Sequence, residues 1–211
     1  MYNPSKEAER MANRESKHAE RIVETAVALF KKNGYENVSV NEICKAAGRS
    51  RSSFYAAFSG KQDIIEYVLA KAKTDETTVL NHFMDAKNDF ERMWILCDRY
   101  LSVAYQFGPE LTGALMRLEL RGELDILKPL HAADDWFIRL MRNCQQTGVF
   151  LSRENAERMA PMGVDNVYMV TYDWCRRGGD FSLRREARIR SEIFYNVAPE
   201  YRWTQAQLEN A

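Results

Sequence analysis

Residues 38–65 read VSVNEICKAAGRSRSSFYAAFSGKQDII and predict two short helices joined by a tight turn. Ser39 and Glu42 have the spacing of a capping box, in which each side chain accepts a hydrogen bond from the backbone N–H of the other residue. Gly48 follows the first helix where a left-handed residue would end it, and Ser50 can cap the second helix at once. Two short helices joined by a glycine-containing turn are typical of a helix-turn-helix.

The second of these helices presents a polar face that core packing does not explain. Phe54 and Phe58 are four residues apart and form its inward stripe. The helical repeat turns the following residues toward solvent or onto the flanks: Arg49, Arg51, Ser52, Ser53, Tyr55 and Ala56. Because basic and small polar side chains of this kind suit the major groove of DNA, we expect this helix to be the recognition helix.

Helical periodicity continues through the rest of the chain, and no run of alternating apolar and polar residues is long enough to predict a sheet. We therefore expect an all-α fold. A first helix is predicted from about Ser16 to Asn33, after a polar segment expected to be a mobile arm or a frayed extension. Later helices are predicted at 61–86, 89–107, 109–121, 125–146, 153–177 (with Ser152 as its N-cap) and 183–197.

Charge is balanced over the whole chain but not along it. The 211 residues include 30 Lys and Arg and 30 Asp and Glu, yet residues 1–73 hold 13 basic against 9 acidic side chains. The first third therefore carries a net charge of +4 and the remainder −4, the sign expected if only the first third meets phosphate. With 45% hydrophobic residues but no membrane-length apolar run and no apolar signal segment, we expect a soluble, cytoplasmic protein without a membrane partner.

The cysteines and histidines do not predict a metal site or a disulfide framework. Cys44, Cys97, Cys144 and Cys175 are scattered, with no C-x-x-C pair and only three histidines beside them. A group of acidic residues after His131 fits an ordinary helix surface better than a metal or acid–base cluster. Since the chain also lacks a Gly-rich phosphate loop, HExxH and GxSxG, we expect neither an enzyme nor a bound metal or cofactor.

The DNA-binding pattern resembles a known family. Residues 38–65, together with AVALFKKNGY at 26–35, look like the DNA-binding signature of the TetR family of bacterial regulators. The resemblance implies an arm and helix-turn-helix domain at 1–60, then a linker helix and a ligand-binding, dimerising domain at 61–211. It also implies a homodimer in which the last two helices of each subunit pack as a four-helix bundle.

Carried over position by position, the resemblance assigns the DNA contacts. Those to phosphate fall on Ser39, Val40 (through its backbone), Ser53, Tyr55 and Lys61. Those to bases fall on Asn41, Arg49, Arg51, Ser52 and Ala56. Ala57 and Gly60 stand where the family often has histidine and asparagine, so one phosphate contact is expected to be missing and to be replaced by basic residues of the arm or first helix. The alternatives are a solvated surface charge for each arginine and a packing role alone for Tyr55.

The second domain offers candidates for an effector pocket and for a dimer interface. Candidate pocket residues are Phe83, Trp94, Tyr100, Tyr105, Glu119, Trp136, Phe137 and Asn166. Candidate dimer residues are Gly163, Val167, Val170 and Trp174 of the penultimate helix, with Ala187, Ile193, Phe194 and Val197 of the last helix. In both sets the alternative is core packing within one subunit, since apolar residues at helical spacing fit either role.

Together these patterns predict a ligand-responsive repressor that a small-molecule effector releases from a palindromic DNA operator. A homodimer fits because its two recognition helices would lie about one turn of DNA apart, a spacing that a ligand could change. The rival interpretations are a helical small-molecule-binding protein or enzyme without DNA targeting, and a helical adaptor that binds only protein. The adaptor would leave the exposed polar face of the recognition helix without a purpose.

Overall fold

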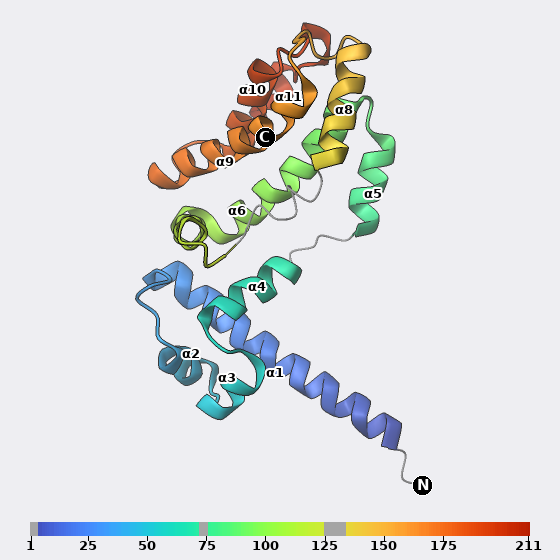
Figure 1. Cartoon of the computed structure of the whole chain (residues 1–211). Coiled ribbons are helices and arrows are strands. Elements are labelled where there is room, and N and C mark those ends of the chain that lie inside the picture. The colour runs from blue at the N-terminus through green and yellow to red at the C-terminus, as the bar shows by residue number, and fades with distance from the viewer. Residues whose placement is uncertain (1–3, 72–75, 125–133) are drawn as a thin grey trace. The chain divides into compact units, whose positions relative to one another are not determined.

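The computed structural model describes residues 4–71, 76–124 and 134–211, and this part of the chain is helical (Figure 1). The only β pairing among the described residues is an isolated bridge, so the expected all-α fold is confirmed. Contacts divide the chain into two compact units, Met1–Ala72 and Lys73–Ala211.

The first unit holds the helices α1 (Pro4–Asn33), α2 (Val40–Ala47), α3 (Arg51–Ala57) and α4 (Lys61–Lys71). Helix α1 begins at Pro4 and not near Ser16, so the segment expected to be an arm continues the helix instead. The composition of that segment, which is rich in Ala, Glu, Lys and Arg, favours a helix even though it lacks an apolar stripe.

A small core holds the helices of the first unit together. Its fully or nearly fully buried side chains are Ile22, Ala26, Phe30, Tyr35, Val38, Ile43, Phe54, Phe58, Ile64 and Ile65. Because Ile64 and Ile65 lie on α4, that helix belongs to this unit. The boundary between the units therefore falls after Ala72 and not after residue 60.

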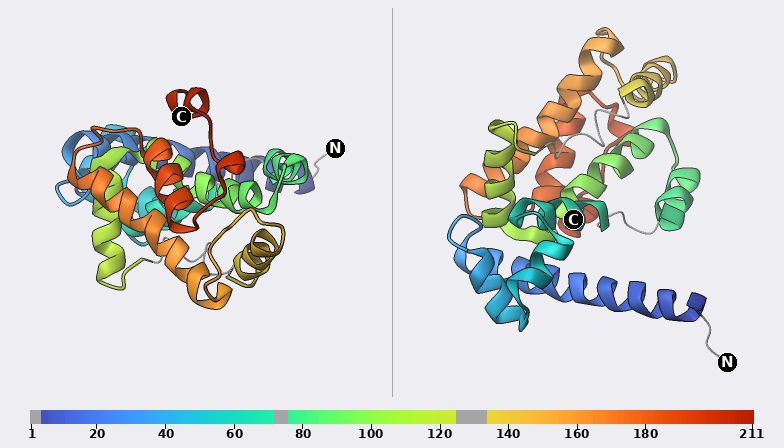
Figure 2. Two further views of the ribbon diagram at one scale, coloured as in Figure 1. Left: turned by 90° about the horizontal axis from the view of Figure 1, so that it is seen from above. Right: turned by 60° about the horizontal axis from the view of Figure 1, so that its bottom comes forward.

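The second unit holds α5 (Glu76–Asp85), α6 (Asp89–Leu120), α8 (Asp134–Gln146), α9 (Ala156–Arg176) and α10 (Leu183–Phe194), followed by η1 (Pro199–Tyr201) and α11 (Gln205–Glu209). Helix α6 bends at Gly108, whose φ of 79° and ψ of 167° are not helical, and Pro109 follows. The break predicted at this pair of residues is confirmed. Helices α9 and α10 lie side by side, and α6 packs against α9 (Figure 2).

Two predicted helices extend beyond the described residues. Within the helix predicted at 61–86 the structure describes α4 and α5, and residues 72–75 between them lie outside the described residues. Of the helix predicted at 125–146 the structure describes α8, and residues 125–133 lie outside.

The beginning of α9 corrects a predicted cap. Asn155, and not Ser152, is the N-cap, because the Asn155 Oδ1 accepts the N–H of Arg158 at 3.0 Å. The Ser152 hydroxyl instead accepts the N–H of Glu154 at 3.4 Å, within the preceding loop. The short elements η1 and α11 after the last predicted helix were not foreseen.

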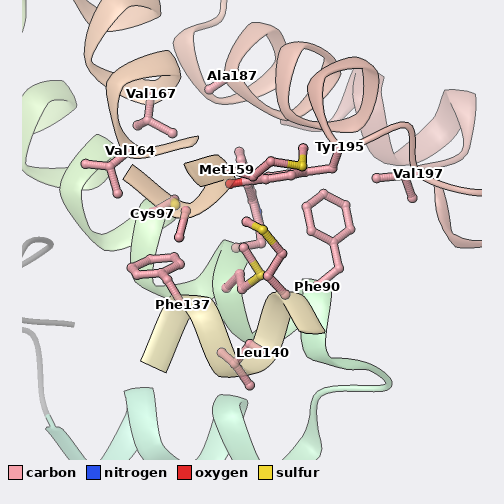
Figure 3. Packing of buried hydrophobic residues seen from close by; sticks show 14 of the residues in the cluster. Phe90, Cys97, Phe137, Leu140, Met159, Val164, Val167, Ala187, Tyr195 and Val197 are labelled. Atoms are coloured by element: carbon pink, nitrogen blue, oxygen red, sulfur yellow. The ribbon is translucent and has the colours of Figure 1, made fainter. Parts of the chain in front are cut away.

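The core of the second unit is formed by α6, α8, α9, α10 and the residues that follow α8 and α10 (Figure 3). At its centre the rings of Phe150 and Tyr195 stack in parallel with 4.7 Å between their centroids, and Phe90 meets both rings edge-on. None of the described helices is both long enough and apolar enough to cross a membrane.

Candidate nucleic-acid interface

The capping box predicted at Ser39 and Glu42 is confirmed, and it fixes the start of α2. Ser39 Oγ accepts the N–H of Glu42 at 3.2 Å, and Glu42 Oε2 accepts the N–H of Ser39 at 2.7 Å. Hydrogen bonds from the backbone and the hydroxyl of Ser39 hold the pKa of Glu42 below its usual range. At the other end Gly48 has a φ of 65°, and the N–H of Arg49 donates to Cys44 O at 2.9 Å. Both ends of α2 are thus capped, and α3 begins directly after the turn.

The start of α3 is a cluster of serine hydroxyls. Ser50 caps the helix by accepting the N–H of Ser53 at 3.1 Å. Its hydroxyl oxygen also lies 2.8 Å from that of Ser52 and 2.9 Å from that of Ser53. Phe54 is fully buried and Phe58 is 5% exposed, so the predicted inward stripe is confirmed. This packing turns the hydroxyl-bearing face of α3 outward.

Two guanidinium groups flank that face, and neither has an ion pair among the residues that the structure describes. Arg51 is exposed and lies over the ring of Tyr55, with 5.8 Å from its Cζ to the ring centroid. Arg49 is half-buried, and its Nε has no hydrogen-bond partner among the described residues. Tyr55 is 50% exposed, so packing in the core does not account for it. These arginines and the tyrosine remain available to an outside partner.

Lys61, at the first position of α4, is held in place by the first unit. Its Nζ donates to Tyr35 O at 2.8 Å and lies 4.6 Å from the centroid of the Tyr35 ring. Partial burial lowers the pKa of Lys61, while Glu36 and Glu42 act in the opposite direction. The ammonium group is therefore held at the N-terminal end of α4. It also has a structural role that the sequence did not indicate.

The structure places the predicted DNA contacts on α2, on α3, on residues that flank these helices and on the first residue of α4. The exposed members are Ser39, Asn41, Arg51, Ser52, Ser53, Tyr55 and Ala56, and the half-buried ones are Val40, Arg49 and Lys61. The side chains of residues 1–17, which include the basic residues of the predicted arm, lie outside the described part.

The predicted pocket residues of the second unit fall into separate places. Trp94 and Phe137 are buried in the core, while Trp136 is 52% exposed and packs on Phe83 with 5.4 Å between ring centroids. Tyr105 is 42% exposed and covers Trp174 of α9. The predicted set therefore includes both core side chains and half-exposed side chains, and the pocket stays a prediction.

Three of the predicted polar pocket residues have buried polar atoms. The Tyr100 hydroxyl and the Asn166 Nδ2 are buried without a hydrogen-bond partner among the described residues, and the Oε2 of Glu119 is also buried. Sequence reasoning missed Tyr168 and Thr171, which lie on α9 beside this group. Their spacing on one face of α9 was a signal that could have found them.

Most of the predicted dimer residues lie inside their own subunit. Val167, Val170, Trp174, Ala187 and Val197 are at most 4% exposed and belong to the core of the second unit. Gly163 faces Tyr195 of the same chain, and Phe194 is partly buried. Of the predicted set, only Ile193 is exposed, at 69%. The apolar stripe chosen from the sequence is thus the inward face of α9.

A second apolar set on α9 and α10 is open to solvent. Met162, Met169 and Tyr172 of α9 are 51%, 53% and 47% exposed, and Ile193 belongs to α10. These α9 residues repeat at intervals of seven and three, so they share one face of the helix. Sequence periodicity indicated both stripes of α9 but did not distinguish the inward stripe from the outward one.

The cysteines do not form a metal centre among the described residues, where no group of three metal-ligating side chains occurs. Burial raises the pKa of Cys97 to about 12, so this thiol stays protonated. His131 lies outside the described residues.

Comparison with known proteins identifies the first unit. Residues 22–68 match the family model described as bacterial regulatory proteins, tetR family. HTH-type transcriptional regulators of Staphylococcus aureus, from strains USA300 and NCTC 8325, are each 32% identical over 88 residues, which are 42% of this chain and 46% of the relative. The chain therefore spans less than half the length of these relatives.

Solved structures resemble the fold over most of the chain. The fatty acid degradation regulator FadR of Bacillus halodurans is 19% identical, with a TM-score of 0.63 over 84% of this chain and 94% of that one. The MbdR regulator of Azoarcus sp. CIB is 20% identical, with a TM-score of 0.60 over 86% of this chain and 98% of that one. FadR of Bacillus subtilis, in complex with stearoyl-CoA, is 19% identical, with a TM-score of 0.63 over 83% and 96%.

At such identities the structural likeness shows the fold alone. The curated relatives and the structures named above are all described as regulators. Residues 22–68, which hold the helix-turn-helix, therefore match the segment that defines bacterial regulatory proteins of the tetR family.

Proposed function

We propose that this chain is a transcriptional repressor that binds a palindromic DNA operator as a homodimer and is released from it by a small-molecule effector. The observation that carries the proposal is the exposed face at the start of α3, where hydroxyls and the guanidinium groups of Arg49 and Arg51 lie opposite the fully buried Phe54. Such a face suits the major groove, and the second unit would hold the effector site and the dimer interface. The protein would act in the cytoplasm, where bacterial DNA lies.

Base reading falls to the arginines at the start of α3. An arginine can donate two hydrogen bonds to O6 and N7 of guanine, which discriminates against other bases by about 1 to 3 kcal/mol. The serine hydroxyls, Tyr55 and Lys61 would contact phosphates, which fixes the register without reading sequence. Lys61 keeps its bond to Tyr35 O in this arrangement, since an ammonium group has further donors.

The proposal is tested by selecting bound sequences from random DNA duplexes with the purified full-length chain. We expect a palindromic site, whose affinity falls with salt because phosphate contacts release counterions. Arg51→Ala should relax the preference at one base pair of each half-site by roughly 1 to 3 kcal/mol. Arg139→Ala is the control, because this arginine is equally exposed but lies on α8 of the second unit. Recovery of no preferred sequence by a folded chain would contradict the proposal.

The dimer would use the outward stripe of α9 and α10, formed by Met162, Met169, Tyr172 and Ile193. Met169→Glu places a charge at the centre of this stripe, and we expect it to weaken dimerisation by at least about tenfold, because burying an unpaired carboxylate is costly. Analytical ultracentrifugation would measure the change, and affinity for the palindromic site should fall with it. The matched control is Met84→Glu on α5, where the methionine is 70% exposed. Equal dimerisation of both variants would place the interface elsewhere.

Release by an effector follows from a shift between dimer conformations. A ligand that binds the conformation with the wrong spacing of recognition helices more tightly would draw the population off DNA. Support comes from the structures of FadR from Bacillus subtilis with stearoyl-CoA and from Thermus thermophilus with lauroyl-CoA, which share this fold. These acyl-CoA ligands are not assigned to this chain, because its second unit has its own buried polar groups.

A further inference from the structure

Arg51 and Tyr55 form a pair on the exposed face of α3. They are four residues apart, so their side chains meet on one side of the helix. The Arg51 guanidinium lies over the Tyr55 ring, with 5.8 Å from its Cζ to the ring centroid. Both residues are exposed, so a molecule that binds to α3 can reach the guanidinium while it lies over the ring. We call Arg51 and Tyr55 the arginine–tyrosine pair.

The core of the first unit orients the Tyr55 ring. Phe54 is fully buried, and its ring meets the Tyr55 ring edge-on, with 5.4 Å between centroids and an interplanar angle of 80°. The Phe54 ring also packs on the buried Phe58, with 5.9 Å between centroids. Aromatic rings attract each other in such arrangements, because the positive edge of one ring meets the negative face of the other. Ring contacts therefore connect the buried core to Tyr55 and, through Tyr55, to Arg51.

Contact with a ring leaves the guanidinium free to read a base. A guanidinium is planar and carries its N–H donors at its edge, where a carboxylate partner would occupy them. The face of an aromatic ring attracts the cation without accepting these N–H groups in the plane. The Arg51 side chain has neither an ion pair nor a hydrogen bond among the residues that the structure describes. Its donors are thus available for O6 and N7 of guanine.

Arg49, the other predicted base reader, is held differently. It precedes the N-cap Ser50 and so lies before the first turn of α3. Its side chain is half-buried, and its buried Nε has no hydrogen-bond partner in the described part of the chain. Within that part no aromatic ring lies against its guanidinium either. A positioning role of Tyr55 therefore concerns Arg51 and not Arg49.

We infer that Tyr55 is the positioning residue of Arg51 and that the Tyr55 ring, rather than its hydroxyl, sets how strongly Arg51 prefers guanine. The inference rests on the proposed function, because it names the pair that reads one base pair of each half-site. The ring restricts the guanidinium before DNA binds, so less side-chain entropy is lost on contact with the base. An unrestricted arginine can also turn to a neighbouring base or phosphate, which lowers the preference. The hydroxyl keeps its separate role as a phosphate contact.

Selection of bound sequences from random DNA duplexes tests this role in variants of the full-length chain. Arg51→Ala identifies the base pair that Arg51 reads. Tyr55→Leu removes the ring and should lower the preference at that same base pair by roughly two- to fivefold, the factor that corresponds to one exposed cation–π contact. Tyr55→Phe keeps the ring and should keep the preference, while affinity falls equally for all sequences because a phosphate contact is lost.

The pattern over the half-site separates positioning from a structural role. If Tyr55→Leu relaxes every base pair alike, Tyr55 only supports α3 and the inference is wrong. An intact guanine preference in Tyr55→Leu, or equal relaxation by Tyr55→Phe and Tyr55→Leu, would also overturn it. Tyr67→Leu is the matched control, because the Tyr67 ring meets the core ring of Phe58 edge-on at 5.8 Å but lies on α4. This variant should leave the guanine preference unchanged.

A measurement without DNA separates this inference from the proposed function. The nuclear magnetic resonance signal of the Arg51 Nε–H, identified by its loss in Arg51→Ala, should be shifted by the ring current of Tyr55. Tyr55→Leu should remove this shift, and Tyr55→Phe should retain it. If a palindromic site is recovered but Tyr55→Leu changes neither the signal nor the preference, the repressor proposal stands and the positioning role fails. If no site is recovered although the signal responds as expected, the repressor proposal fails and the base-reading role fails with it.

Discussion

Replacing Arg188 with alanine is expected to lower the free energy of unfolding of the second unit by about 3 to 5 kcal/mol, because the change leaves the buried carboxylate of Glu192 and the partly buried carboxylate of Glu91 without their counterion. Arg188 lies on α10 and has no exposed surface. Its Nε donates to Glu192 Oε1 at 2.7 Å, and its Nη2 donates to Glu91 Oε1 at 2.6 Å. One guanidinium group thus neutralises two acids from different helices.

Aromatic rings and the C-terminal segment complete the surroundings of Arg188. Its Cζ lies 4.2 Å from the ring centroid of Phe90, 5.3 Å from that of Trp94 and 4.8 Å from that of Trp203. The backbone N–H of Trp203 also donates to Glu192 Oε1 at 2.9 Å. Loss of the guanidinium would therefore loosen the contacts among the start of α6, α10 and the residues after α10.

Urea unfolding followed by tryptophan fluorescence measures this change. All four tryptophans lie at or beyond residue 94, so the signal reports the second unit. The control is Arg142→Ala, which breaks an exposed ion pair with Glu157 and should cost less than about 1 kcal/mol. Adding Glu91→Gln and Glu192→Gln to Arg188→Met should recover much of the loss, since no buried charge would remain. Equal effects of Arg188→Ala and Arg142→Ala would contradict the expectation.

The helix-turn-helix could be predicted in detail because its signals are local. A capping box is a relation between residues three apart, and the left-handed Gly48 directly precedes the next cap at Ser50. The inward pair Phe54 and Phe58 then fixes which face of α3 is exposed. Each of these features can be recognised without knowing what else packs nearby.

The second unit could not be predicted to the same depth because its decisive contacts join distant parts of the chain. Helix α9 has apolar residues on its inward and outward faces, and periodicity alone gave no reason to choose between them. Arg188 forms an ion pair with Glu91, which lies 97 positions earlier in the sequence. No pattern of neighbouring residues indicated that Arg188 would be buried. Where α6 and α9 pack together, sequence reasoning selected Tyr100 and Glu119 but missed their neighbours Tyr168 and Thr171.

Replacing Gly163 with alanine is expected to destabilise the second unit by roughly 2 kcal/mol, although alanine is the better helix former. A Cβ at this position would overlap the Oη of Tyr195 and lie 2.8 Å from its Cζ. Tyr195 is 5% exposed and its ring is stacked on Phe150, so it has little room to move. The gain from helix propensity is about 1 kcal/mol, and overpacking a core costs about 1 to 3 kcal/mol or more for so close a contact.

Gly113→Ala is the matched control for Gly163→Ala. Gly113 also lies within a helix, but a Cβ there would be 3.5 Å from the Cβ of Cys175, an ordinary contact. This variant should be neutral or up to about 1 kcal/mol more stable. Tyr195→Phe in the Gly163→Ala background removes the oxygen that clashes most and should restore part of the loss, because the Cζ contact of 2.8 Å remains.

The Gly163 variant also decides between the two faces of α9. If the close approach at Gly163 is to Tyr195 of the same subunit, the loss appears in urea unfolding and is relieved by Tyr195→Phe. If Gly163 instead allowed the approach of a second subunit, as the sequence suggested, the variant would keep its unfolding free energy as a monomer and lose dimerisation. Because the Tyr195 ring already fills the space above Gly163, we expect the first result, which leaves the outward stripe of α9 free to form the dimer.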